Sequence, residues 1–400
     1  METDQQNVSE EDLVAVTKQN TPLKTSITDK EPIPLDLAVE ICSRLPAKSV
    51  SRFCCVSKLW ATIPRLPYFN DLVLTRFLAH PRLLFASGTR NHMFFYSSPQ
   101  PQNHKKSSVF AANYHMKTPC HGSSYETCSY VRGLVLIKGE QLFGKNKVWV
   151  ICNLSTEQSV TLLHLKKREK IGMRCYFGYE PIKKQYKVLS MTRNTDEEHQ
   201  VLTLGTSGTL SWRRTRTKCC IPHTLYSRCN HVCIDGVLYY PAVNTATRRR
   251  IIVIFDLRSE KFRFVKDPIP LSFSRYGSPL INYNGKLGLL RYKKEGGIYG
   301  SCTSFSLWVL EDEEKHVWSE HVYVLPSFWK NMVGGENAIL RVVGVTRTNE
   351  FVLTFSSIPW KPFYVYYYNA ESNTIRSVKI QGLGAFKGHS VYTFLDHMVV

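Results

Sequence analysis

The sequence predicts an α+β chain of two parts: a short helical region, then an all-β domain that is most simply a β-propeller of about six blades. Three observations carry this prediction. Apolar residues recur at helical spacing in residues 33–63. From Arg82 onward the chain consists of short β-branched and aromatic runs between polar turns. These runs repeat about every 50 residues, the period expected of four-stranded, kelch-like propeller blades.

The helical region reads as three short helices with almost nothing between them. In the first, Leu37 and Ile41 recur on one face, Pro34 is a start signal and Pro46 ends the helix. Helices this short bury too little surface to fold alone, because domains below about 40 residues usually need a partner or a staple. The surplus of apolar residues therefore indicates a docking face.

This region resembles the F-box in the form seen in large plant families. The matching residues are Ile33 to Leu37, Glu40 and Ile41, Arg44 to Ser49, Arg52 and Phe53, Cys55 to Lys58, and Trp60. Cys42, Ser51 and Cys54 depart from the usual sequence without introducing a buried charge. The resemblance implies that the region binds a Skp-family adaptor and, through it, a cullin scaffold and a RING subunit. The implied adaptor-binding residues are Pro34, Leu35, Leu37, Ile41, Leu45, Pro46, Val50, Phe53, Val56 and Trp60.

The β-region contains paired hairpins, such as the one around Asp235-Gly236 followed by another at Arg258 to Glu260. Five such pairs are legible, and a sixth blade follows if the first strand after Arg82 and the last strand of the chain share a sheet. Seven blades and a pair of β-sandwiches are the alternatives. The expected domains are a disordered acidic tail (1–30), the F-box helices with a linker helix (31–80) and the β-domain (82–400).

The β-region also resembles the plant F-box-associated domain of type 3. The segments that carry this resemblance are 177–191, 201–213, 234–240, 255–262 and 282–287. Together the two resemblances imply a non-catalytic substrate-recognition subunit of an SCF-type (Skp-cullin-F-box) ubiquitin ligase, which presents a target protein on its β-domain. The alternative is a β-propeller that binds proteins or nucleic acid outside a ligase.

Composition favours a cytoplasmic or nuclear chain that is not secreted. The N-terminus lacks a basic start followed by an apolar run, and no apolar run is long enough to span a bilayer, so no membrane association is expected. The 12 cysteines should therefore stay reduced. The net charge of +20 belongs to the β-domain, because residues 1–30 are acidic, and it favours acidic partners.

No enzyme, cofactor or metal site is expected. The sequence contains no G-x-S-x-G or H-E-x-x-H motif and no acid pair at a defined spacing. The best metal candidates follow no usual ligand spacing, and small cysteine side chains pack well between propeller blades, so packing is the favoured explanation. The candidates are Cys219, Cys220, His223, Cys229, His231 and Cys233.

Four basic clusters lie between expected strands: 166–170, 213–218, 248–250 and 291–294. These clusters form either a solvated rim or a site for an acidic or phosphorylated target. A nucleic-acid site is the less favoured alternative, because it would also need aromatic side chains on which bases stack. We expect target contacts in the loops 241–250 and 356–362, because connecting loops vary over a rigid scaffold. The residues chosen are Arg248, Arg249, Arg250 and Trp360.

Overall fold

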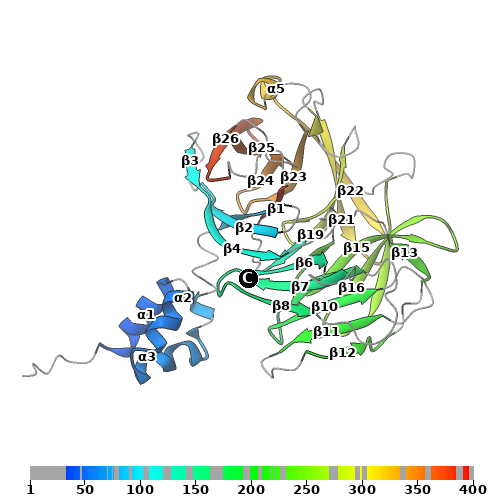
Figure 1. Cartoon of the computed structure of the whole chain (residues 1–400). Helices are drawn as coiled ribbons and strands as arrows, with labels where there is room; N and C mark the ends of the chain where they lie inside the picture. Colours follow the sequence, from blue (N-terminus) through cyan, green and yellow to red (C-terminus); the bar gives the residue numbers. More distant parts are fainter. Residues whose placement is uncertain are drawn as a thin grey trace, which may run out of the picture.

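The computed structural model places a group of short helices beside a ring of β-sheets (Figure 1). The described residues are 33–45, 47–69, 71–73, 75, 81–89, 92–101, 108–119, 128–140, 147–162, 174–191, 199–205, 210–217, 219, 221–225, 231–269, 278–292, 298–299, 304–333, 339–355, 362–383 and 391–395. Among the helices in these ranges, none is both long and apolar enough to cross a membrane.

The helical region forms three helices, as the sequence predicts, and a 3-10 turn. They are α1 (Leu35–Arg44), α2 (Ala47–Cys54), α3 (Lys58–Thr62) and η1 (Ile63–Arg65). Helix α1 begins directly after Pro34, and the Ser57 hydroxyl caps α3 by accepting a hydrogen bond from the Trp60 N–H at 3.4 Å. A small core joins them, made of Ala38, Val39, Cys42, Val50, Ile63 and Phe69.

The β-domain is a six-bladed propeller, which confirms the predicted blade number. Blade 1 contains β1 (Arg82–Gly88), β2 (His92–Pro99), β4 (Asn113–Pro119) and β27 (Val391–Leu395). Blade 2 contains β5 (Cys128–Val131), β6 (Leu134–Glu140), β7 (Lys147–Asn153) and β8 (Gln158–Leu162). Blade 3 contains β9 (Arg174–Glu180), β10 (Gln185–Met191), β11 (Gln200–Leu204) and β12 (Trp212–Arg214).

In the second half of the ring, blades 4 and 6 have additional strands. Blade 4 contains β13 (His223–Leu225), β14 (Val232–Ile234), β15 (Val237–Asn244), β16 (Arg250–Asp256) and β17 (Phe262–Lys266). Blade 5 contains β18 (Leu280–Tyr283), β19 (Lys286–Tyr292), β21 (Ser304–Asp312) and β22 (Val317–Val324). Blade 6 contains β20 (Ile298–Tyr299), β23 (Ile339–Val345), β24 (Glu350–Phe355), β25 (Phe363–Asn369), β26 (Thr374–Gln381) and β3 (Ser108–Ala111). A short helix, α5 (Trp329–Met332), lies between blades 5 and 6 in the chain.

Two strand pairings close the ring between the chain ends. Strand β27 pairs antiparallel with β1, with Phe85 opposite Thr393, so the first and last strands share blade 1 as predicted. Strand β3, from the connection between β2 and β4, pairs in parallel with β26 of blade 6, with Phe110 opposite Ile380. Blades 1 and 6 are therefore joined by their edges as well as by packing.

The core consists of six apolar clusters, one between each pair of neighbouring blades. Blades 6 and 1 share such a cluster, in which Phe85 of β1 and Phe363 of β25 pack edge to face with ring centroids 5.7 Å apart. Because an apolar core fills every interface between neighbouring blades, the sheets form a closed ring and the alternative of two separate β-sandwiches is wrong.

Turn chemistry repeats from blade to blade. Arg132-Gly133, Asp235-Gly236 and Asn284-Gly285 each have two successive positive φ angles, as the tight two-residue hairpin between a first and a second strand requires. Many of the third-to-fourth-strand hairpins begin with an Asp or Asn whose side chain accepts backbone N–H groups of the turn. Asn153 bonds the N–H groups of Ser155 and Thr156 in this way. The hairpin expected at Thr206 to Gly208 lies outside the described residues.

Alternation of strand direction divides the propeller into two faces. Hairpins that join the first to the second strand, and the third to the fourth, lie on one face, here named the turn face. Hairpins that join the second to the third strand, and crossings from blade to blade, lie on the opposite face, here named the loop face. The tight turns described above belong to the turn face, and the β15–β16 hairpin at residues 245–249 belongs to the loop face.

Candidate docking surfaces

The helical region exposes large apolar side chains that its small core does not use. Leu37 on α1 is 55% exposed and Val56, just after α2, is 71% exposed. The neighbouring α1 residues Ala38 and Cys42 are fully buried, so the apolar residues of α1 divide between the core and the surface. A group of exposed apolar side chains on a soluble domain marks an interaction surface.

The implied adaptor-binding residues occupy three environments. Pro34, Leu35, Leu37, Ile41 and Val56 are exposed. Leu45, Phe53 and Trp60 are half-buried, and the rings of Phe53 and Trp60 lie 4.9 Å apart. Val50 is buried within the helical core, where it supports the surface from beneath. Pro46 lies outside the described residues. The assignment of these residues to an adaptor stays a prediction.

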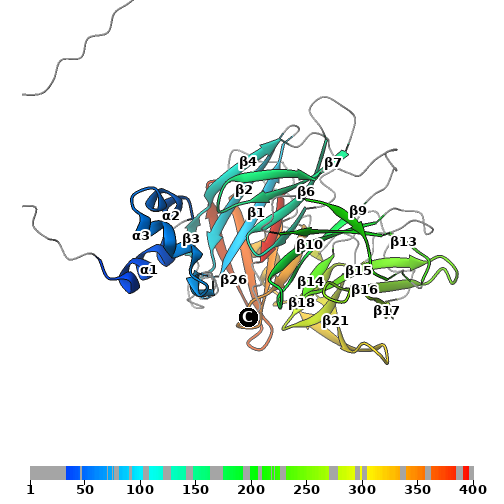
Figure 2. The same cartoon turned by 90° about the horizontal axis from the view of Figure 1, so that it is seen from below.

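The helices lie beside the propeller (Figure 2), and two ion pairs join them to its turn face. The Lys48 ammonium lies 3.2 Å from the carboxylate of Glu157, in the β7–β8 turn, and the Lys184 ammonium, in the β9–β10 turn, lies 2.8 Å from Asp71. Each exposed ion pair stabilises by only about 0–1 kcal/mol, so the pairs indicate placement rather than strength. The loop face is therefore the face opposite the helices.

The β15–β16 hairpin presents two arginines on the loop face. The Asn244 side chain accepts the N–H groups of Ala246 and Thr247 at 2.9 and 3.0 Å, which fixes the turn. Arg248, with a φ of 56°, and Arg249 are both exposed. Within the described residues, neither side chain forms an ion pair.

Arg250 does not fit the predicted target-binding role. It is the first residue of β16, and its guanidinium and the Asp267 carboxylate are both almost fully buried. The Arg250 Nε donates to Asp267 at 2.7 Å. The prediction failed because the sequence places three arginines in a row, whereas strand geometry turns the third into the protein. Trp360 lies outside the described residues.

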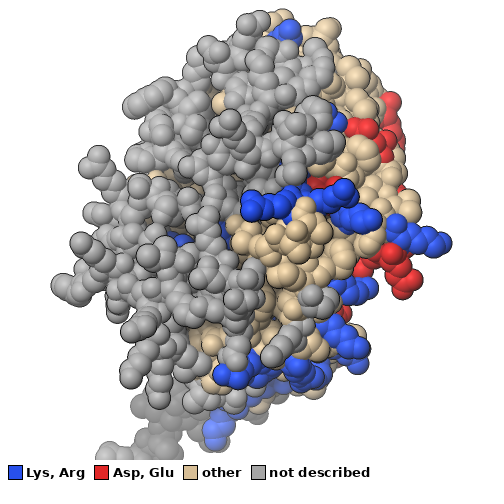
Figure 3. Space-filling model, turned by 90° about the vertical axis from the view of Figure 1, so that its right-hand side faces the viewer, with Lys and Arg blue, Asp and Glu red and all other residues tan. Residues whose placement is uncertain are grey.

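The acidic residues are concentrated on one of the two faces. Within the described propeller, every Asp and Glu except Glu140, Asp267 and Glu320 lies in or beside a turn of the turn face. Exposed cations lie on both faces: Lys184, Arg258, Lys286, Lys315 and Arg347 lie in or beside turn-face turns, and Arg248, Arg249 and Lys266 lie at loop-face strand ends. In the part of Figure 3 that shows described residues, Lys and Arg lie from the centre to the lower right, and Asp and Glu lie among them toward the right-hand edge.

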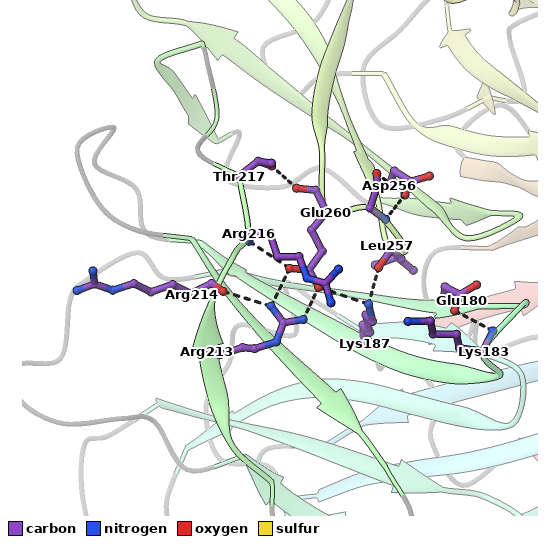
Figure 4. A network of polar contacts seen from close by, with 11 residues as sticks. Glu180, Lys183, Lys187, Arg213, Arg214, Arg216, Thr217, Asp256, Leu257 and Glu260 are labelled. Carbon is purple, nitrogen blue, oxygen red and sulfur yellow. Dashed lines mark hydrogen bonds and ion pairs between the residues drawn. The ribbon is translucent and has the colours of Figure 1, made fainter.

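A buried ionic network joins blades 3 and 4 (Figure 4). The Glu260 carboxylate, fully buried, accepts from both ends of the Arg213 guanidinium and from the Arg216 N–H at 3.2 Å. The buried Lys187 ammonium lies 3.4 Å from the same carboxylate and donates to the Leu257 carbonyl at 2.5 Å.

Burial and charge act in opposite directions within this network. Burial favours the neutral form of Glu260, but Arg213, the Arg216 N–H and Lys187 together hold the pKa of Glu260 below its ordinary value. Burial lowers the pKa of Lys187, although Glu260 opposes the shift. The network explains why part of the basic cluster at 213–218 is structural: Arg213 holds two blades together.

The histidines and cysteines considered as metal ligands have other partners. His231 Nε2 accepts from the Phe177 N–H at 3.0 Å, His223 Nδ1 lies 2.8 Å from the Ile221 carbonyl, and the Cys233 thiol donates to the Tyr179 carbonyl at 3.8 Å. Among the described residues, no three His, Cys, Asp or Glu side chains converge as metal ligands. Cys220 and Cys229 lie outside those ranges.

Comparison with known proteins agrees with both parts of the fold. Residues 32–72 match the F-box domain family, and residues 82–398 match the family described as the F-box associated beta propeller domain. The chain is an F-box protein with an F-box-associated propeller. It is similar to F-box protein DOR of Arabidopsis thaliana, with 48% identity over 376 residues that cover 92% of this chain and 93% of that protein. It is also 43% identical over 405 residues to F-box protein At5g65850 of Arabidopsis thaliana, covering 100% of this chain and 97% of that protein.

Two features of this F-box protein are absent from the sequence-based predictions. The strand β3 has no signal, because its pairing with β26 joins segments far apart in the chain. The sequence contains a partial signal for the Glu260 network. Lys187 interrupts an otherwise apolar strand between Tyr186 and Val188, which suggests a buried charge that needs a partner. The sequence does not say which acid supplies it.

Proposed function

We propose that this F-box protein is the non-catalytic substrate-recognition subunit of an SCF-type ubiquitin ligase. Its F-box docks a Skp-family adaptor, through which the cullin scaffold and the RING subunit assemble. The family supports this role, since F-box proteins with an F-box-associated domain generally act as such receptors. The exposed apolar residues of α1 supply a surface that an adaptor would cover.

The observation that carries the proposal is the placement of the two docking surfaces. The helices contact the turn face, so the loop face of the propeller stays free to receive a target. The closed ring between them is rigid, because all six blade interfaces are packed. A receptor of this form catalyses nothing itself. It holds a target lysine near the activated ubiquitin, which converts an encounter into an effectively intramolecular step.

Adaptor binding by the full chain tests the proposal. Leu37 and Ile41 lie one helical turn apart on the exposed side of α1, so the variant Leu37→Asp/Ile41→Asp places two charges in the contact. Loss of central apolar anchors costs about 2 kcal/mol or more each, so recovery of the co-expressed adaptor should fall by at least about 100-fold. The control is Val322→Asp, at an exposed apolar position of β22 on the propeller.

Two results would contradict the proposal. One is failure of the unmutated chain to bind any Skp-family adaptor, which would leave a propeller that binds its partners outside a ligase. The other is undiminished adaptor recovery with Leu37→Asp/Ile41→Asp, which would remove α1 from the interface.

A further inference from the structure

We propose that the loop face binds an acidic protein segment, and that Arg248 and Arg249 contact its carboxylate or phosphate oxygens. This inference rests on the proposed function, because the segment belongs to the target that the receptor presents. It adds the chemical class of that target and two residues that recognise it.

The first argument is the uneven distribution of acidic residues. The turn face, which the helices contact, carries nearly all acidic residues of the described propeller, mixed with exposed Lys and Arg. At the described strand ends of the loop face, the exposed cations Arg248 and Arg249 have few acidic residues around them, and Asp267 is buried with Arg250. A surface with one sign of charge attracts the opposite sign and accelerates its association.

The second argument is the construction of the β15–β16 hairpin. Its backbone is fixed by the Asn244 side chain and by Thr245, whose N–H and hydroxyl donate to the Pro222 carbonyl at 3.0 and 3.1 Å. Arg250 is anchored on Asp267 at the base of the same hairpin. Arg248 and Arg249 therefore project from a backbone held on both sides, and little backbone entropy is lost when they bind. Arginine suits this task because its planar guanidinium binds carboxylate or phosphate oxygens in pairs.

The third argument favours a protein segment over nucleic acid. Binding of single strands uses exposed aromatic rings as stacking platforms beside the charge. Of the exposed aromatic side chains in the described ranges, Tyr68 belongs to the helical region and Tyr114 lies near the turn-face end of β4. Only Phe328 lies on the loop-face side, in the crossing that follows β22. Among the described residues, the loop face therefore offers a single exposed ring, whereas a strand of stacked bases needs several.

The test measures peptide binding by the full chain in complex with its adaptor. The probes are fluorescent 12-residue peptides: a Glu-Ser repeat, its phosphoserine form and a neutral Gln-Ser repeat, with a single-stranded oligonucleotide of matched charge. The variant is Arg248→Glu/Arg249→Glu. The matched control is Arg258→Glu/Lys261→Glu, which makes the same charge change at exposed positions of the same blade on the turn face.

We expect the unmutated chain to bind the acidic peptides in preference to the neutral one. Arg248→Glu/Arg249→Glu should weaken that binding about tenfold or more, and the turn-face control about twofold at most. Tighter binding of the phosphoserine peptide than of the Glu-Ser repeat would identify phosphate as the preferred ligand, and equal binding of the two would identify carboxylate. Either result supports the inference. Equal weakening by both variants, or tighter binding of the oligonucleotide than of the acidic peptides, would overturn it. Adaptor binding is measured in the same preparations. Failure to bind the adaptor, which would contradict the proposed function, is therefore distinguished from failure to bind the peptides.

Discussion

The buried carboxylate of Glu260 is the point at which a small change should most disturb the propeller. In Glu260→Ala, the Arg213 guanidinium loses its partner but is 42% exposed and can turn to water. Lys187 cannot, because its side chain is 6% exposed and retains only the Leu257 carbonyl. Removing one partner of a buried pair costs about 3–5 kcal/mol, and most of that cost falls on Lys187.

Urea unfolding of the full chain, followed by tryptophan fluorescence, measures this cost. Glu260→Ala should lower the free energy of unfolding by about 3–5 kcal/mol, and adding Lys187→Met should recover most of the loss, because no buried charge then lacks a partner. The control is Glu157→Ala, which removes an exposed pair with Lys48 and should cost less than about 1 kcal/mol.

The pH dependence supplies an independent check. Since the pKa of Glu260 is lowered on folding, its stabilising contribution is present at neutral pH and is lost as the pH falls below the ordinary value of 4.5. The decrease in the free energy of unfolding at acidic pH should therefore be smaller in Glu260→Ala than in the unmutated chain. Unchanged stability of Glu260→Ala, or failure of Lys187→Met to restore it, would refute the argument that an unpaired ammonium dominates.

Three further predictions concern packing and titration. Gly178→Ala should lower the free energy of unfolding by about 1–3 kcal/mol, because its new Cβ would lie 2.7 Å from Leu257 Cδ1. If Leu257→Ala is added, the combined loss should be smaller than the sum of the two single losses, because the shorter side chain leaves room for the Cβ. Urea unfolding measures both. Burial holds the pKa values of His199 and His231 at about 4, so the free energy of unfolding should decrease as the pH falls from 6.5 toward 4, by up to about 1.4 kcal/mol per pH unit for each histidine. His231→Gln should reduce this slope, and an unchanged slope would contradict the argument. Phe110→Asp should lower the melting temperature, because Phe110 packs into the cluster between blades 6 and 1. The control Val109→Asp, on the exposed side of β3, should leave the melting temperature unchanged. Equal effects of the two variants would mean that the β3–β26 pairing does not help to close the ring.

The sequence by itself determined the features that depend on near neighbours. Helical spacing and Pro34 located α1, and Asp235-Gly236 and Asn284-Gly285 located hairpins, because positive φ at two successive residues has few sequence solutions. The repeat of these hairpins about every 50 residues gave the blade number. The resemblance to the F-box and to its associated domain, confirmed over residues 32–72 and 82–398, rests on similarly local motifs.

Only the tertiary structure decided which residues of each motif are free to bind. Leu37 and Ala38 are adjacent and both apolar, yet one is exposed and the other buried, because packing of η1 and α2 selects one side of α1. Arg249 and Arg250 are adjacent and both basic, yet only Arg250 meets an acid, because β16 pairs with β17 and brings Asp267, 17 residues away, opposite Arg250. Glu260 meets Lys187 across 73 residues. Periodicity along the chain carries no information on such contacts, because they depend on which helices, strands and blades pack against one another.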